Sequence, residues 1–182
     1  MFMRTERLFL RPVFPEDWRD IHRGIAHEAI VRNLARAPWP YSEDDARDFC
    51  NRPAQLNATR FAITLPSVAG APVIGMIGVD DFDGAAKELG YWIGQPWQRR
   101  GFATEAVRGV LEIVSALGVE TVEAGHFLDN PASGGVLSKA GFVPTGEIKP
   151  TSCVARGGAK VPARRFIKVL SETGRSSYPA AA

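Results

Sequence analysis

The chain has 182 residues, of which 45% are hydrophobic and 23% are charged, and its formal net charge is +2. This length fits one domain with a short tail, and the nearly balanced charge argues against a dedicated nucleic-acid-binding protein. No apolar run approaches the roughly 20 residues of a membrane-spanning helix, so we expect neither a membrane protein nor a secretory signal.

The first part of the chain predicts one strand and two helices. "RLFLRPV" (7–13) alternates apolar and polar residues, which predicts a strand that ends at Pro12. In "PEDWRDIHRGIA" (15–26) the apolar residues recur at helical spacing, so we predict a helix there. Ser42 is a suitable N-cap, and the acidic residues after it predict a short helix over 42–52.

Three strands are expected next, at "FAITL" (61–65), "VIGMIGVDDF" (73–82) and "ELGYWIG" (88–94). The turn-forming stretches "SVAGAP" and "DGAAK" between them predict hairpins. "ATEAVRGVLEIVSALG" (103–118) then places its apolar residues on one helical face and closes with Gly118. A strand (119–128), a short helix ended by Gly141 (130–141) and two late strands (142–155 and 161–170) complete the pattern.

This order of elements predicts an α+β (mixed α/β) fold, with one mixed sheet of about seven strands and helices on both faces. We expect the domain to span 5–170 and the aperiodic residues 171–182 to form a disordered tail. Cys50 and Cys153 form no CxxC motif and no disulfide framework, which favours structural roles and a cytoplasmic location.

The stretch "WQRRGFATEA" (97–106) lies where a strand gives way to a helix. A helix N-terminus presents unpaired N–H groups and the positive end of its dipole, so it binds anions. Gly101 lets a ligand approach the backbone, Ala103 keeps the approach open, and Arg99 and Arg100 add positive charge. The stretch therefore predicts a pyrophosphate cradle; the alternative is an ordinary loop with two solvated arginines.

"QRRGFA" matches the Q/R-x-x-G-x-G/A signature of the GNAT superfamily of acetyl-CoA-dependent N-acetyltransferases. "ELGYWIGQPWQRRGFATEAV", "DNPASGGVLSKAGF" and the opening "TERLFLRPVFPEDW" together resemble the RimJ/RimL-like branch, from about Thr5 to Leu170. The resemblance implies a twisted GNAT-like sheet and direct acetyl transfer from acetyl-CoA to an amine in a ternary complex. It implies no metal, and a homodimer is common in such families.

The resemblance also assigns a coenzyme site. The cradle amides are expected to hold the pyrophosphate, and the strand before the cradle to splay from its neighbour so that the pantetheine arm inserts like an extra strand. Asn130 matches the family asparagine that hydrogen-bonds this arm, and it can also serve as a helix cap. The residues expected to bind the coenzyme are Trp92, Ile93, Gly94, Gln98, Arg99, Arg100, Gly101, Phe102, Ala103, Asn130 and Ser133.

Acetyl transfer to an amine requires a base for the amine proton and a proton for the leaving thiolate. Many relatives place a tyrosine as the acid where this chain has Leu137, which cannot donate a proton. Ser133 stands in the position that the RimL-like pattern uses instead, so it is the expected donor. Glu88 is the expected base, with Asp80 and Asp81 as alternatives that could also attract a cationic amine.

The acceptor is expected to be an amine, either a protein N-terminus or a small molecule. Trp39 and Tyr41 fall between the first two predicted helices, where relatives shape the acceptor pocket, although both residues could equally be core aromatics. A module that binds acyl-CoA or a partner protein without turnover remains the alternative. RNA binding through the basic stretch 149–168 is a weaker third interpretation.

Overall fold

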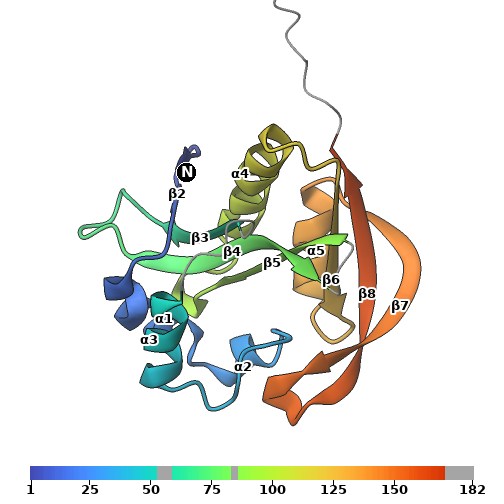
Figure 1. The fold of residues 1–182 in the computed structure, drawn as a ribbon, viewed down its shortest axis with the longest axis horizontal. Coiled ribbons are helices and arrows are strands. Elements are labelled where there is room, and N and C mark those ends of the chain that lie inside the picture. The colour runs from blue at the N-terminus through green and yellow to red at the C-terminus, as the bar shows by residue number, and fades with distance from the viewer. Residues whose placement is uncertain (53–58, 83–85, 171–182) are drawn as a thin grey trace, which may run out of the picture.

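One mixed sheet runs through residues 1–52, 59–82 and 86–170, the part of the chain that this computed structural model describes. Its eight strands lie in the order β1-β2-β3-β4-β5-β6-β8-β7 (Figure 1). The additional strand, beyond the seven predicted, is the two-residue β1. The strands are β1 Met3–Arg4, β2 Phe9–Arg11, β3 Thr59–Thr64, β4 Val73–Phe82, β5 Ala86–Ile93, β6 Thr121–Phe127, β7 Val143–Cys153 and β8 Ala159–Val169.

All predicted helices form, and their ends carry the expected signals. The Ser42 side chain accepts a hydrogen bond from the Asp45 N–H at 3.1 Å, and the Asp45 carboxylate accepts one from the Ser42 N–H at 2.8 Å. Gly118 follows its helix in a left-handed conformation, with φ of +82°. A short α2 was not predicted. The helices are α1 Trp18–Ile25, α2 Glu28–Val31, α3 Glu43–Asn51, α4 Phe102–Ala116 and α5 Pro131–Lys139.

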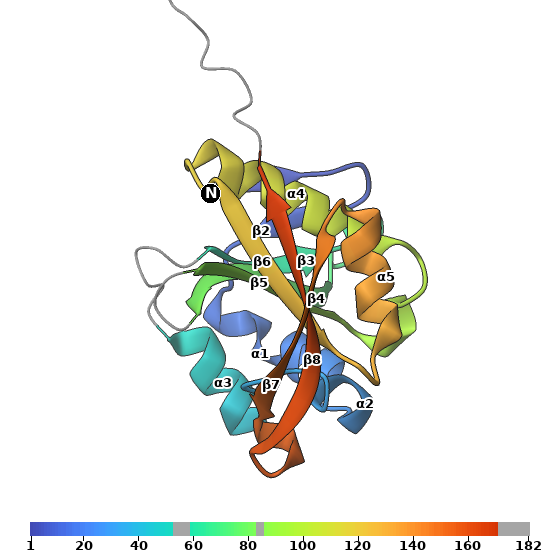
Figure 2. The ribbon, with the colours of Figure 1, turned by 90° about the vertical axis from the view of Figure 1, so that its right-hand side faces the viewer.

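The helices divide between the two faces of the sheet, as predicted (Figures 1 and 2). Successive side chains of a strand point to opposite faces. Ile77 and Leu89 therefore pack in the core under α4 and α5, whereas Met76 and Trp92 pack with the residues of α1, α2 and α3. This alternation places Asp80 and Glu88, paired across β4 and β5, on the α1 and α3 face.

The sheet changes direction at its centre. β4 and β5 pair antiparallel, as the predicted hairpin requires, although residues 83–85 of its turn lie outside the described residues. β5 and β6 pair parallel, and α4 is the connection between them. The predicted tail, 171–182, also lies outside the described residues. In the described chain, no helix combines the length and apolarity needed to span a bilayer.

Candidate active site

The parallel strands β5 and β6 separate toward the start of α4. Their pairing covers only Lys87–Leu89 against Val122–Ala124, and both strands continue beyond it. β6 instead continues its pairing with β8 on its other side. The expected splay is confirmed, and it leaves a gap in the sheet that is edged by the second half of β5.

The hydrogen bonds of β5 show which backbone groups face this gap. The Gly94 N–H donates to the Ile74 carbonyl at 2.9 Å, and the Gly94 carbonyl accepts a 2.9 Å bond from the Trp97 N–H. By strand alternation the backbone of Trp92 also points toward β4. The expectation of free backbone groups at Trp92 and Gly94 is therefore wrong. The groups that point into the gap belong to Tyr91 and Ile93, and the Ile93 carbonyl already accepts a 2.8 Å bond from the Gln98 side chain.

The start of α4 forms a turn with two left-handed residues, Arg99 at φ +62° and Gly101 at φ +82°. Gly101 is the N-cap, and no side chain caps the helix. The first N–H groups of α4, including those of Phe102 and Ala103, are consequently available to an anion. Gln98 differs from expectation, because its N–H donates to the Gln95 carbonyl and its side chain braces β5.

Arg7, which the sequence analysis missed, stabilises this turn through contacts with Arg100 and Phe102. Its Nη1 donates to the Arg100 carbonyl at 3.0 Å, and its guanidinium lies 4.6 Å above the Phe102 ring. Glu105 anchors Arg7 by accepting bonds from its backbone N–H at 2.7 Å and its Nε at 2.8 Å. Burial alone would raise the pKa of Glu105, but bonds from Thr5 and Arg7 outweigh it and lower that pKa.

The two arginines of the cradle lie differently. Arg99 lines the cavity beside the start of α4. Arg100 is exposed and its guanidinium stacks 5.4 Å from the centre of the Trp97 ring, outside the residues that line the cavity. Of the two side chains, that of Arg99 thus lines the cavity, whereas Arg100 contributes only its backbone to the cradle.

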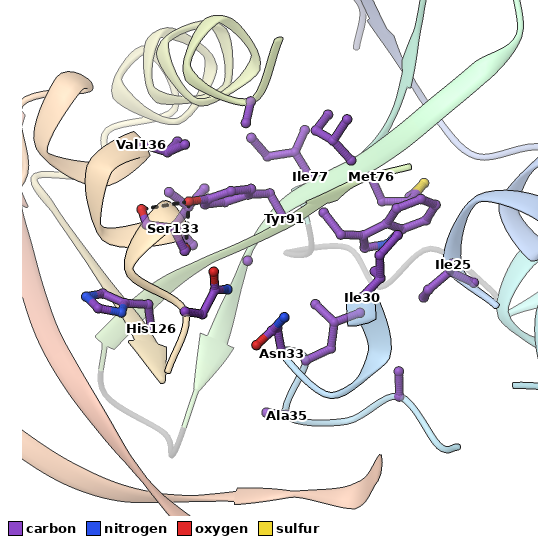
Figure 3. A pocket seen from close by; sticks show the side chains of 18 of the residues that line it. Ile25, Ile30, Asn33, Ala35, Met76, Ile77, Tyr91, His126, Ser133 and Val136 are labelled. Atoms are coloured by element: carbon purple, nitrogen blue, oxygen red, sulfur yellow. Dashed lines mark hydrogen bonds between the residues drawn. The ribbon is translucent and has the colours of Figure 1, made fainter. Parts of the chain in front are cut away.

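A single cavity of about 940 Å³ connects the cradle with the opposite face of the sheet. It passes through the gap beside β5, next to α5, and reaches the apolar side chains of α1 and α2 (Figure 3). A ligand can therefore lie on both sides of the sheet at once. Its lining includes Ile25, Ile30, Asn33, Tyr41, Met76, Gly78, Asp80, Glu88, Gly90, Tyr91, Trp92, Arg99, Gly101, Asn130, Ser133 and Arg165.

Two hydroxyl groups meet in the gap. The Tyr91 Oη lies 2.8 Å from the Ser133 Oγ and also donates to the Ser133 carbonyl at 3.2 Å, as Figure 3 shows. Burial raises the pKa of Tyr91 to about 12, so the phenol stays protonated.

Leu137, by contrast, is fully buried in the core. Asn130 is the N-cap residue of α5 but makes no side-chain capping bond, and its side chain lines the cavity.

Glu88 is held by Arg165, another residue that the sequence analysis missed. Arg165 is buried, and its guanidinium donates to Glu88 Oε1 at 2.6 Å and to Glu123 Oε2 at 3.1 Å. Gly125, opposite Arg165 in β6, makes room for it, because a Cβ there would lie 2.7 Å from Arg165 Nη1. The strand glycine of β6 was the signal for this buried cation.

Asp80 is paired in the same manner, since Arg60 Nε donates to its Oδ2 at 3.1 Å. The second oxygens, Asp80 Oδ1 and Glu88 Oε2, are buried and have no hydrogen-bond partner in the described chain. Asp80 and Glu88 are direct cross-strand neighbours, which puts their Cβ atoms about 5 Å apart. Asp80 and Glu88 are thus two adjacent carboxylates in the lining of the cavity.

The remaining predicted acceptor residues separate into one inside the cavity and two outside. Tyr41 is buried and lines the cavity, and burial raises its pKa to about 12. Trp39 is 41% exposed and lies outside the lining residues, so the expected contact is not seen. Asp81 is also outside, because it turns to solvent and pairs with Lys87 at 2.8 Å.

The described residues contain no group of three or more histidine, cysteine or acidic side chains that could bind a metal. Cys50 and Cys153 are both buried free thiols. The thiol of Cys153 donates to the Leu34 carbonyl at 3.3 Å, which ties the end of β7 to the segment after α2. The burial of both thiols agrees with the structural roles predicted for Cys50 and Cys153.

Known proteins resemble the chain over most of its length. A curated N-acetyltransferase of uncharacterised specificity, YnaD of Bacillus subtilis (strain 168), is 24% identical over 159 residues, or 86% of this chain and 90% of YnaD. RimL, a ribosomal L7/L12 α-N-protein acetyltransferase solved with coenzyme A, is 16% identical with a TM-score of 0.78, covering 94% of this chain and 99% of RimL. A Vibrio cholerae spermidine N-acetyltransferase, solved with CoA and spermine, is 21% identical with a TM-score of 0.74, covering 91% and 97%.

These neighbours share the fold that the sequence predicted. In addition, residues 7–143 match the family described as the acetyltransferase (GNAT) domain. The matched segment contains the cradle, β5, Asn130 and Ser133, and therefore the whole path from Arg99 to the gap. The chain thus belongs to the GNAT family of acetyltransferases, a family of acyl-transferring enzymes.

Proposed function

We propose that this enzyme transfers the acetyl group of acetyl-CoA to a primary amine. The observation that carries the proposal is the continuous cavity from the uncapped start of α4, through the gap beside β5, to the paired carboxylates of Asp80 and Glu88. Such a cavity offers an anion site, an extended strand edge and acid–base groups in one line. Structural relatives bind coenzyme A and acetylate a ribosomal protein or spermidine.

The residues at the cradle fit the coenzyme. The N–H groups of Gly101, Phe102 and Ala103 and the Arg99 guanidinium would hold the diphosphate, because they combine unpaired donors with positive charge. The Tyr91 and Ile93 backbone groups would pair with the amides of the pantetheine arm as an added strand. Asn130 would bind the same arm from the opposite side of the gap.

Acetyl-CoA supplies an acetyl group in a thioester. The groups around the gap would act on the amine that attacks this thioester and on the sulfur that leaves it. The Glu88 carboxylate would accept the proton that the amine loses as its nitrogen bonds to the acetyl carbon. Ser133 Oγ would donate a hydrogen bond to the sulfur as the carbon–sulfur bond breaks, and the coenzyme would leave as a thiolate that takes its proton from solvent. Tyr91 would hold the Ser133 hydroxyl in place through the 2.8 Å contact of its Oη with the Ser133 Oγ.

The proposal is tested by measuring thiol release from acetyl-CoA with a panel of amines, including short peptides with free N-termini and small primary amines. We expect thiol release that depends on an amine, with one acetylated amine formed for each thiol. Binding of acetyl-CoA without acetylation of any amine would instead indicate a non-catalytic acyl-CoA-binding module. Failure to bind acetyl-CoA at all would refute the assigned cofactor.

The hydroxyl pair gives a second prediction. Ser133→Ala should lower kcat by about 10²-fold, the lower range of acid–base catalysis, with acetyl-CoA affinity unchanged. Tyr91→Phe keeps the ring in place and should lower kcat less, because the serine hydroxyl remains. Since the two groups act as a unit, the double variant should fall no further than Ser133→Ala. Full activity of Ser133→Ala, or strictly additive losses, would remove Ser133 from the donor role.

A further inference from the structure

Gly90 lies in the middle of β5 without a packing reason to be glycine. A glycine within a strand weakens it, because the residue loses more conformational freedom and offers no side chain to pack. Gly90 does not have a positive φ, and a Cβ built on it meets no atom within 4 Å. The backbone at this position would thus accept any β-forming residue.

The other glycines in the described strands have visible causes. A Cβ at Gly75 would lie 2.3 Å from the Trp92 carbonyl, and a Cβ at Gly78 would lie 3.0 Å from the Thr59 carbonyl. Gly125 makes room for Arg165, and Gly146 has a φ of +85°. Gly90 is exposed although it belongs to a central strand, and it lines the cavity. Empty space beside a central strand indicates that a ligand approaches there.

Gly90 pairs directly with Gly78, so two adjacent residues on this face lack side chains, and we call this place the glycine hollow. On one side of it lies the Asp80–Glu88 pair, and on the other the Met76–Trp92 pair. Each pair is two residues along the strands from the hollow, or about 7 Å. Asn33 and the apolar Ile30 lie across the cavity from β5 (Figure 3).

We infer that Gly90 is a specificity-determining residue: the hollow receives the substituent that the acceptor carries next to its amine. The inference rests on the proposed function, since it places the ammonium at Asp80 and Glu88. The substituent then extends over the hollow toward Met76 and Trp92. Because these are apolar, the acceptor is a primary amine on an apolar or aromatic body.

The charges of the lining narrow the acceptor class further. Arg60 and Arg165 already bind the carboxylates of the acid pair, so these two cations offer no partner to a carboxylate on the substrate. A free amino acid would place its carboxylate beside Asp80 and Glu88, where like charges repel. A polyamine would place its second ammonium against the apolar Met76 and Trp92. Asp45, the other acid among the described lining residues, already accepts bonds from the Ser42 N–H and hydroxyl.

The test compares 2-phenylethylamine, methylamine, spermidine and phenylalanine as acceptors for the wild type and Gly90→Val. The wild type should prefer 2-phenylethylamine over spermidine and phenylalanine. Gly90→Val should lower kcat/KM for 2-phenylethylamine about 10- to 100-fold more than for methylamine, because the valine fills the hollow. Ser152→Val adds the same side chain to the exposed strand β7, outside the cavity. It should leave the ratio of kcat/KM for 2-phenylethylamine to kcat/KM for methylamine at its wild-type value.

The outcomes separate this inference from the proposed function. A wild type that acetylates neither these amines nor the peptides of the first panel refutes the proposed function, whereas one that acetylates only peptides refutes the acceptor class. If the wild type acetylates amines but Gly90→Val lowers kcat/KM equally for 2-phenylethylamine and methylamine, the hollow does not receive the acceptor's substituent and the inference is wrong. A wild type that favours spermidine or phenylalanine refutes the acceptor class. A Gly90→Val variant that instead discriminates between propionyl-CoA and acetyl-CoA, with amine preference unchanged, shows that the hollow holds the acyl chain and overturns the inference.

Discussion

Gly101→Asp is expected to abolish the binding of acetyl-CoA. A Cβ on Gly101 would lie 3.3 Å from Arg7 Nη2, so the new carboxylate would stand beside Arg7 at the N-cap of α4, next to the N–H groups where a diphosphate is proposed to bind. Bringing like charges together in such a site costs several kcal/mol, so the affinity should fall by at least about 10²-fold. Titration calorimetry with acetyl-CoA measures this loss directly, and no thiol release should be detectable at ordinary substrate concentrations.

The strain of the substitution has a matched control. Gly118, just past the other end of α4, has the same φ of +82°, and a Cβ there meets nothing within 4 Å. Gly118→Asp therefore carries a similar left-handed strain of about 1–2 kcal/mol but lies far from the cradle. The melting temperature of Gly118→Asp should fall about as much as that of Gly101→Asp, while its affinity for acetyl-CoA should stay at the wild-type value. Unchanged affinity of Gly101→Asp would show that the diphosphate does not bind there.

The sequence carried the elements whose signals are local. Ser42 with Asp45 makes a capping box within four residues, and Gly118 follows the last turn of its own helix, so both ends of helices were predictable. The cradle was predictable for the same reason, because its left-handed Gly101 and the start of α4 are neighbours in sequence.

The contacts that complete the site join distant parts of the chain. Arg7 and Glu105 are 98 residues apart, Glu88 and Arg165 are 77 apart, and Tyr91 and Ser133 are 42 apart. No periodic pattern records which strand of a sheet lies beside which. The correction at Trp92 and Gly94 has another origin, because the hydrogen-bonded positions of an antiparallel pair depend on its register, and residue types do not reveal that parity.

The acceptor side shows the same limit. Trp39 and Tyr41 are two residues apart and equally aromatic, yet only Tyr41 reaches the cavity. The difference depends on the path of the irregular segment between α2 and α3, which has no helical or strand period to follow. Asp80 and Asp81 differ for a simpler reason: adjacent residues in a strand face opposite sides, so only one of them can join Glu88.

Glu88→Gln is expected to lower kcat by about 10²- to 10⁴-fold, the usual contribution of a positioned base. Glutamine has the same shape and can still accept the bond from Arg165, but its second group is an amide that cannot take a proton. The affinity for acetyl-CoA should stay unchanged, because Glu88 lies beyond the gap from the cradle. Single-turnover thiol release measures the chemical step apart from binding.

Glu123→Gln is the matched control that separates chemistry from architecture. Glu123 accepts a bond from the same guanidinium at 3.1 Å but lies outside the residues that line the cavity. If Glu88 acts only as an anchor for Arg165, the two variants should lose similar stability and similar activity. If Glu88 is the base, the large loss of kcat belongs to Glu88→Gln alone. A greater loss in Asp80→Asn would transfer the role to Asp80, whose side chain lines the same cavity.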